Sequence, residues 1–182
     1  MELLSDTIFG NGRSIPGGED IAVLHDEKGF PYFKGSTMKG IFREELERYL
    51  SWQGRDAEGR DTAIKTLGIS GDKRITDDDK LIFADFHISE NVKQTVIRDV
   101  GNRPTAILDL LTNIRAFTKL EDGMVANGSL RTARCVNKGL VFYSSIQCDP
   151  QDENMVAEVL SLVKWIGTMR SRGFGKVKIS VV

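Results

Sequence analysis

Two amphipathic segments among short apolar runs limit the folds open to this chain more than any other sequence feature. Within residues 36–50, and again within residues 152–169, apolar side chains recur at the spacing of one helical face. Short apolar runs rich in β-branched residues, which predict strands, occupy residues 2–9, 81–88, 139–148 and 174–182. This order predicts an α+β, ferredoxin-like (RRM-like) βαββαβ fold with an antiparallel sheet.

The segments between these elements predict insertions into a single domain that spans residues 1–182. A length of 182 residues and a hydrophobic content of 40% suit one core better than two. Residues 51–80 are polar and predict an insertion with a short helix near residues 57–67. Residues 91–127 predict a second, thumb-like insertion in the form of a protruding hairpin.

Two further strand predictions complete the sheet. Residues 20–25 are apolar and end at the turn Asp26–Gly29, which favours an additional strand near the first one. Residues 129–136 and 139–148 are expected to pair with each other across a tight turn at residues 137–139.

The lack of a recognisable targeting pattern in the sequence and the spacing of its cysteines favour a cytoplasmic protein without a membrane partner. The sequence has no apolar run long enough for a membrane span and no basic-then-apolar leader at residues 1–10. Cys135 and Cys148 lie in apolar stretches without CxxC spacing, so we interpret them as buried thiols in a reducing compartment.

Charge is distributed unevenly along the chain, although the net charge is only −1. Residues 1–91 carry 12 basic and 18 acidic side chains, whereas residues 92–182 carry 13 basic and 8 acidic ones. No acidic residue follows Glu158, while five basic residues do. Such a segment attracts a polyanion, although a solvated basic surface has the same composition.

The first motif with chemical meaning is Gly35-Ser-Thr-Met-Lys-Gly-Ile-Phe-Arg43, at the start of the first predicted helix. Free backbone N–H groups and the positive end of the helix dipole favour an anion there. Lys39 and Arg43 are four residues apart and therefore lie along one side of the helix. Gly40 inside the helix suggests the close approach of another group. An ordinary amphipathic helix with solvated cations fits the same pattern.

The second motif is Arg170-Ser-Arg-Gly-Phe-Gly-Lys-Val177, after the second predicted helix. Glycines allow a backbone to lie against a sugar–phosphate chain, arginines neutralise phosphates, and an aromatic ring can stack on a base. A helix C-terminus with basic residues near the dipole explains part of the motif equally well. The candidate RNA contacts in this loop are Arg170, Arg172, Gly173, Phe174, Gly175 and Lys176.

These motifs resemble those of the RAMP superfamily, the repeat-associated proteins of CRISPR effector complexes. Gly35–Arg43 is similar to its G-S-x-x-K-G-x-x-R segment, and Arg172–Val177 is similar to its C-terminal glycine-rich loop. Leu81–Asp85 and Asn113–Thr118 resemble further family segments in the same order, so the likeness spans most of the chain. It is greatest to the repeated backbone subunits of type III effectors.

The resemblance implies a guide-RNA-binding role. Such subunits stack along a CRISPR guide RNA, and each thumb displaces one nucleotide of the duplex between the guide and its complementary target RNA. The implied partners are both RNAs, other effector subunits and further copies of the same chain. Besides Lys39, Arg43 and the loop at residues 170–176, we expect RNA contacts from Arg115, Arg131 and Arg134, for which a solvated surface is the alternative.

The resemblance also implies metal-dependent cleavage of target RNA. Asp20 falls on the position of the family's catalytic aspartate, and Asp26 falls on that of a second acid. Glu19 and Ile21 depart from the family pattern on either side of Asp20. A single carboxylate is a weak metal ligand set, because hard cations take six or more oxygens. We therefore expect Mg²⁺ or Mn²⁺ to be held by Asp20 together with RNA phosphates.

Two other functions fit the sequence. A RAMP subunit that only binds or caps guide RNA would need the cationic motifs but not Asp20. A small metabolic enzyme could use both glycine-containing segments as phosphate clamps, although no pair of general acid and base can be named for it.

Overall fold

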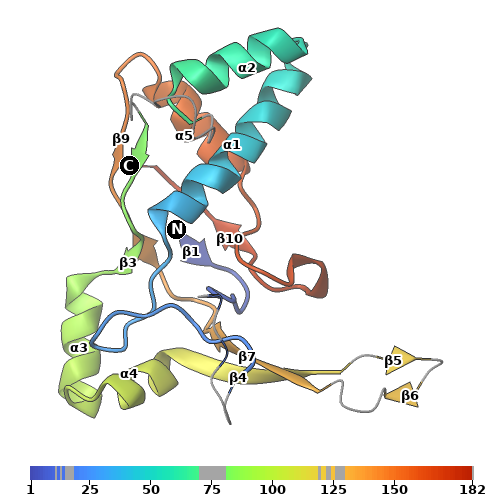
Figure 1. The fold of residues 1–182 in the computed structure, drawn as a ribbon. Helices are drawn as coiled ribbons and strands as arrows, with labels where there is room; N and C mark the ends of the chain where they lie inside the picture. Colours follow the sequence, from blue (N-terminus) through green and yellow to red (C-terminus); the bar gives the residue numbers. More distant parts are fainter. Residues whose placement is uncertain are drawn as a thin grey trace.

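The body of the molecule is a sheet of short antiparallel strands with two packed helices beside it and a long hairpin that projects from one end (Figure 1). The computed structural model describes residues 1–10, 12, 14, 19–69, 81–118, 120–121, 124–125 and 130–181. Within this part of the chain, no helix has the length and apolar character that a membrane crossing requires.

The sheet confirms the predicted antiparallel ferredoxin-like arrangement. All its strand pairs are antiparallel, and a bridge between Glu2 and Val141 joins the first strand to the strand that carries β8. The predicted strand at residues 81–88 is interrupted at Ala84 and Asp85. The paired strands are β1 (Glu2–Leu3) with β10 (Val177–Lys178), β2 (Ile82–Phe83) with β9 (Ile146–Gln147), and β3 (His87–Ile88) with β8 (Phe142–Tyr143).

Helix α1 (Gly35–Trp52) forms because its apolar residues fall on one face, as the sequence predicts. Met38, Phe42 and Leu46 on this face are fully buried, and the helix packs against α5 (Glu153–Leu162) and β2. The short helix predicted near residues 57–67 is α2 (Ala57–Thr66), which packs on α1. Asp56 caps α2 by accepting a hydrogen bond of 2.8 Å from the Gly59 amide.

The second long helix ends earlier than predicted. Helix α5 stops at Leu162, and Val163 has extended dihedral angles (φ −65°, ψ 109°). The chain then turns back on itself, because the Ile166 amide donates to the Gly175 carbonyl (2.8 Å) and the Val177 amide to the Lys164 carbonyl (2.9 Å). The apolar spacing misled because Val163 and Ile166 are both buried in the extended form. Residues 163–177 therefore form a hairpin, whose tip holds a 3₁₀ turn at Arg170–Arg172.

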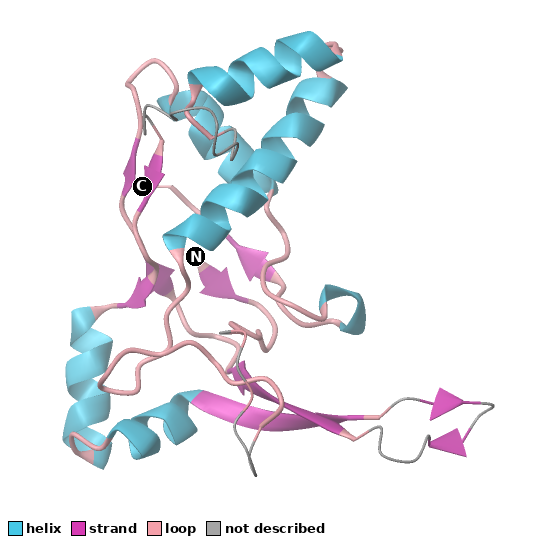
Figure 2. Ribbon diagram, in the orientation of Figure 1, coloured by secondary structure: helices cyan, strands magenta, loops and turns pink. Residues whose placement is uncertain are grey.

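The prediction of one hairpin over residues 91–127 is wrong in its first half. Residues there form α3 (Glu90–Val100), which Ser89 caps, and α4 (Pro104–Leu111), which begins with a proline at a position that helices favour. The thumb is instead a ribbon of β4 (Thr112–Phe117) and β7 (Arg131–Val136), shown as the long strands in Figure 2. Two short strands, β5 (Leu120–Glu121) and β6 (Met124–Val125), pair beyond it.

The expected pairing between residues 129–136 and 139–148 is also wrong. Strand β7 pairs with β4 along all six of its residues. The following segment instead pairs with strands from earlier in the chain, since β8 joins β3 and β9 joins β2. The turn at Gly139 (φ 86°) thus carries the chain from the thumb into the sheet. Residues 70–80 of the predicted insertion lie outside the described residues.

Candidate nucleic-acid interface

The outer end of β4 on the thumb meets the tip of the hairpin at residues 163–177. The rings of Phe117 on β4 and Phe174 at the tip lie 5.4 Å apart at an interplanar angle of 70°. The Arg172 guanidinium lies 5.7 Å from the centre of the Phe117 ring, within the range of a cation–π contact. Two motifs that the sequence separates by more than fifty residues are therefore in direct contact. Phe174 is half-buried, and part of its ring is covered by the contact with Phe117 on the thumb.

An open groove with a volume of about 730 Å³ runs along this junction. Arg115 comes from the thumb, Lys138 from the turn that follows it, and Arg172 from the hairpin tip. All three are exposed. The other wall is the segment Leu4–Asp6, which continues β1. The groove thus gathers cations from three separate parts of the chain.

Asp6 organises one side of the groove, although sequence reasoning missed it. Its carboxylate accepts hydrogen bonds from Arg115 Nη2 (2.8 Å), Asn113 Nδ2 (3.2 Å) and the Lys138 amide (3.1 Å). Partial burial would raise the pKa of Asp6, but these hydrogen bonds outweigh it and hold that pKa below its usual value. Its partners lie more than a hundred residues away, so the local sequence around Asp6 carries no signal of this role.

The two glycines at the hairpin tip have different roles. Gly175 has a φ of +82°, and a Cβ there would collide with the Ile166 carbonyl oxygen, so this position closes the hairpin. Gly173 has a φ of +86°, but nothing in the described structure lies within 4 Å of a Cβ added there. Gly173 therefore leaves its backbone accessible beside Arg172, whereas Gly175 is a structural residue.

Asp20 lies against the first residues of β7, near the outer end of the β4–β7 ribbon. Its Oδ2 accepts a hydrogen bond of 2.7 Å from the Thr132 amide and one of 3.3 Å from the Thr132 hydroxyl. Arg131 Nη1 lies 3.4 Å from its Oδ1. The Thr132 backbone hydrogen bond is the main reason why the pKa of Asp20 is lowered. The side chain is 39% exposed, so an ionised carboxylate is held at a fixed place and remains accessible.

An ion-pair network around the largely buried pair of Arg134 and Glu19 fixes the segment that carries Asp20. Arg134 on β7 donates to Glu19 through Nε (2.7 Å), and its Nη2 also contacts that carboxylate. Its Nη1 donates to Asp109 on α4 (2.7 Å) and to the Thr112 hydroxyl (3.0 Å). Glu19, which departs from the family pattern, is thus the partner of Arg134. The network ties α4, both thumb strands and the Asp20 segment together.

The start of α1 is arranged differently from the hairpin tip. Its first amide, that of Gly35, donates a 2.8 Å hydrogen bond to the Asp85 carboxylate, so an acid of this chain already lies at the positive end of the helix. A cavity of about 390 Å³ separates the helix from the hairpin, and it is lined by Lys34, which precedes α1, and by Thr37 and Ile41 on α1.

Lys39 and Arg43 do not share that face. Each is two residues from Ile41 along the chain, and two residues correspond to a rotation of about 200° around the axis of an α-helix. They therefore project from another side of α1 than the one that meets Arg170, which lines the same cavity from the hairpin. Around Gly40, nothing within the described residues lies within 4 Å of an added Cβ. The structure brings the start of α1 to the hairpin, but not its two cations.

Asp26 lies apart from Asp20 in a turn of its own. Its Oδ1 accepts hydrogen bonds from the amides of Lys28 (3.0 Å) and Phe30 (2.9 Å), and Lys93 lies 4.0 Å from its Oδ2. This is the pattern of an aspartate that stabilises a turn. Among the described residues, no group of three or more His, Cys, Asp or Glu side chains is placed to hold a metal ion.

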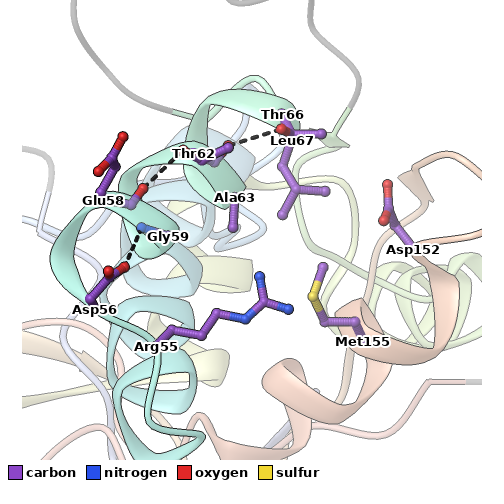
Figure 3. Close-up of a pocket in the computed structure, with 10 residues that line it drawn as sticks. All are labelled: Arg55, Asp56, Glu58, Gly59, Thr62, Ala63, Thr66, Leu67, Asp152 and Met155. Atoms are coloured by element: carbon purple, nitrogen blue, oxygen red, sulfur yellow. Dashed lines mark hydrogen bonds between the residues drawn. The ribbon is translucent and has the colours of Figure 1, made fainter.

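A separate cavity of about 530 Å³ lies between α2 and α5 (Figure 3). Its polar groups are largely used by α2 itself, since Asp56 caps the helix and the Thr62 hydroxyl donates to the Glu58 carbonyl (2.9 Å). We therefore place the candidate site along the β4–β7 ribbon of the thumb and not in this cavity.

Comparison with known proteins identifies the family of the chain. The family model described as the RAMP superfamily matches residues 1–178. No curated protein sequence matches the chain.

Solved structures share the fold at low sequence identity. A chain of the type III-B Cmr-beta complex bound to cognate target RNA, seen by cryo-electron microscopy, aligns with a TM-score of 0.70 and 11% identity over 97% of this chain and 93% of that one. A chain of the apo Cmr-beta complex aligns at 0.67 with 13% identity over the same shares. Oligomeric Cmr4 from Pyrococcus furiosus aligns at 0.51 with 15% identity over 98% of this chain and 95% of that one.

Proposed function

Because the chain belongs to the RAMP superfamily, we propose that it is an RNA-binding backbone subunit of a type III CRISPR effector complex. One observation carries the proposal: the groove in which Arg115, Lys138 and Arg172 converge between the thumb and the hairpin tip. The similar solved structures support the assignment, since one of them is described as bound to cognate target RNA.

The groove suits a phosphate backbone better than a base edge. Lys138 and Arg172 are exposed cations, and Gly173, whose backbone is accessible, lines the same groove. Arg115 is held by Asp6, which fixes the direction of its guanidinium. Contacts of this kind position a nucleic acid without reading its sequence, as a subunit that accepts many guides requires. Their strength should fall steeply with salt.

The partners that follow are a CRISPR guide RNA, its complementary target RNA, other effector subunits and further copies of this chain. One similar structure is described as oligomeric Cmr4, which supports stacking of copies. Head-to-tail stacking uses two different surfaces and need not close, so the length of the RNA would set the number of copies.

We further propose that Asp20 supports cleavage of the target RNA. In such a reaction the 2′-oxygen of one nucleotide forms a bond to the adjacent phosphorus, the bond from phosphorus to the 5′-oxygen breaks, and the leaving oxygen takes a proton. The Asp20 carboxylate is ionised and pointed by Thr132, so it can take the proton of the 2′-hydroxyl. Most of the rate would come from in-line geometry imposed by the thumb.

A divalent cation fits this site only with help from the RNA. Asp20 offers one carboxylate, and no described cluster adds two more ligands of the kind that hold metals. Mg²⁺ or Mn²⁺ would therefore be held mainly by RNA phosphates, with one oxygen from Asp20. When bound, the ion would offset negative charge on the phosphate.

A non-catalytic RAMP subunit, which only binds or caps guide RNA, is the second candidate. The contacts of Asp20 favour it, because Thr132 and Arg131 already engage both carboxylate oxygens. In that case Asp20 would have a structural role, because its hydrogen bonds hold its own segment against the thumb.

Cleavage of labelled RNA separates the two candidates. The chain is assembled with guide RNA, and complementary labelled RNA is added with Mg²⁺ or Mn²⁺. Cuts at regular intervals that disappear in Asp20→Ala, while guide binding and thermal stability are retained, support the catalytic form. Guide binding without cuts supports the second candidate. Absence of RNA binding by the intact chain contradicts both.

A further inference from the structure

Three aromatic side chains form a row across the paired strands β3 and β8 and the neighbouring extended segment that carries Tyr32. His87 on β3 lies directly opposite Tyr143 on β8. The bridge between Phe33 and Phe86 places Tyr32 opposite His87 on the other side. The rings of Tyr32 and His87 are stacked, with centres 5.4 Å apart and an interplanar angle of 20°. The row therefore consists of Tyr32, His87 and Tyr143, in this spatial order.

This row lies on the sheet face that points away from the core. Successive residues of a strand point to opposite faces, and the neighbours Phe33, Phe86 and Phe142 are all buried in the core cluster that includes α1 and α5. Tyr143 is 60% exposed. Aromatic cross-strand pairs stabilise sheets, which accounts for the contact between Tyr32 and His87. That role does not require the ring of Tyr143 to be exposed.

The same face connects the row to the groove. Leu4 lines the groove, and its amide donates to the Lys176 carbonyl (2.8 Å) on the neighbouring strand. One step further along the sheet Glu2 lies opposite Lys178 and is bridged to Val141. Tyr143 follows Val141 by two residues and so points to the same side. Four residues of strand separate the row from the groove, a distance on the order of 14 Å.

Charge along this route suits a nucleic acid. Lys176 and Lys178 are both exposed and face one acid, Glu2, which lies between them and the row. Tyrosine and histidine present planar faces together with hydrogen-bonding groups at the ring edge. Such surfaces bind bases of any sequence, because every base has a π-face.

We propose that Tyr32, His87 and Tyr143 form a platform on which unpaired RNA bases stack where the strand leaves the groove. This inference rests on the proposed function, since the groove supplies the phosphate contacts that bring the RNA to the platform. The ligand is single-stranded RNA, and the platform would be indifferent to the order of its bases.

Fluorescence anisotropy with a fluorescein-labelled single-stranded RNA tests the platform. Tyr143→Leu keeps an apolar side chain but removes the aromatic face, and it is expected to weaken binding about tenfold, as is Tyr32→Leu. Tyr143→Phe retains the ring and should bind like the wild type. Trp52→Ala is the matched control, because Trp52 is 70% exposed but lies at the end of α1, away from both groove and row.

Photo-crosslinking gives a second readout that loss of stability cannot imitate. RNA that carries 4-thiouridine should yield a crosslinked peptide containing Tyr143 or Tyr32 in the wild type. Wild-type affinity in both leucine variants, together with weakened binding in Arg172→Ala, would contradict the platform and leave the groove intact. Wild-type affinity in all three variants would contradict the platform and the proposed function together. If Tyr143→Leu changes self-association but not RNA affinity, another protein surface covers the row and the inference is wrong.

Discussion

The start of α1 and the hairpin tip at residues 163–177 look alike in sequence but differ in structure. Each combines glycines with closely spaced cations, and each predicts an anion site. At the start of α1, Asp85 of the chain itself accepts the Gly35 amide, and Lys39 and Arg43 project from a side other than the one near the hairpin. At the hairpin tip, Arg172 lies over Phe117 and lines an open groove. Cations near glycines therefore line an open groove only where a second element, here the thumb, lies against them.

The largest expected effect is on the free energy of unfolding, and it concerns the ion-pair network of Arg134, which holds the thumb in place. Arg134 and Glu19 have side chains that are 15% and 8% exposed, so Arg134→Ala would leave a buried carboxylate without its partner. Loss of one partner of a buried pair costs about 3–5 kcal/mol. Urea unfolding should show a decrease of this size. The matched control is Arg131→Ala, whose side chain is 68% exposed and whose pair with Asp20 should contribute no more than about 1 kcal/mol. Equal effects would contradict the distinction.

The two glycines of the hairpin tip offer a sharper comparison within the groove. In Gly175→Ala, the positive φ alone costs about 1–2 kcal/mol, and the collision with the Ile166 carbonyl adds to it. Gly173→Ala has the cost of the positive φ without the collision. The midpoint temperature of thermal unfolding should therefore be lower for Gly175→Ala than for Gly173→Ala. The reverse order would mean that the hairpin is closed in some other way.

A smaller effect is expected at the start of α1. Asp85→Ala removes the carboxylate that accepts the Gly35 amide, a loss comparable with that of an N-cap at about 1 kcal/mol. RNA affinity should stay at its wild-type value, because the groove lies elsewhere. Asp85→Asn, which keeps an oxygen acceptor, serves as the control in both measurements. Weaker RNA binding by Asp85→Ala would show that the start of α1 belongs to the interface after all.

The smallest effect is a dependence of stability on pH through Asp6. Its pKa is lower in the folded chain than in the unfolded chain, where an aspartate has a pKa of about 3.9. The stabilisation is therefore complete above that value and is lost as the pH falls through the lower, folded pKa. Acid unfolding of Asp6→Asn should lack this contribution. If the free energy of unfolding fell with decreasing pH in the same way for Asp6→Asn and the wild type, the role assigned to the hydrogen bonds of Asp6 would be contradicted.

Local periodicity was sufficient for the elements that bury a continuous face. Helix α1, the short helix α2 and the antiparallel ferredoxin-like sheet follow the predicted pattern, because each has one apolar side with a single way to bury it. The end of α5 was predicted wrongly because Val163 and Ile166 satisfy helical spacing and are nevertheless buried in an extended segment.

Pairing between distant segments was the part that the sequence could not predict. The local turn at residues 137–139 favoured a hairpin with the next strand, but β7 buries Ala133 and Cys135 by pairing with β4 instead. For the same reason Asp6 was not identified as a site residue, and Arg134 was expected to contact RNA and not to lie in an ion-pair network. Their partners come from other parts of the chain, and only the folded structure brings them together.

The salt dependence of RNA affinity in Arg172→Ala tests the central claim most directly. Lys164→Ala is the matched control, because Lys164 is an exposed cation on the same hairpin but does not line the groove. The account predicts weaker binding for Arg172→Ala and a plot of log affinity against log salt that is less steep by about one unit, with no change for Lys164→Ala. Identical affinities and slopes for the wild type and both variants would contradict it.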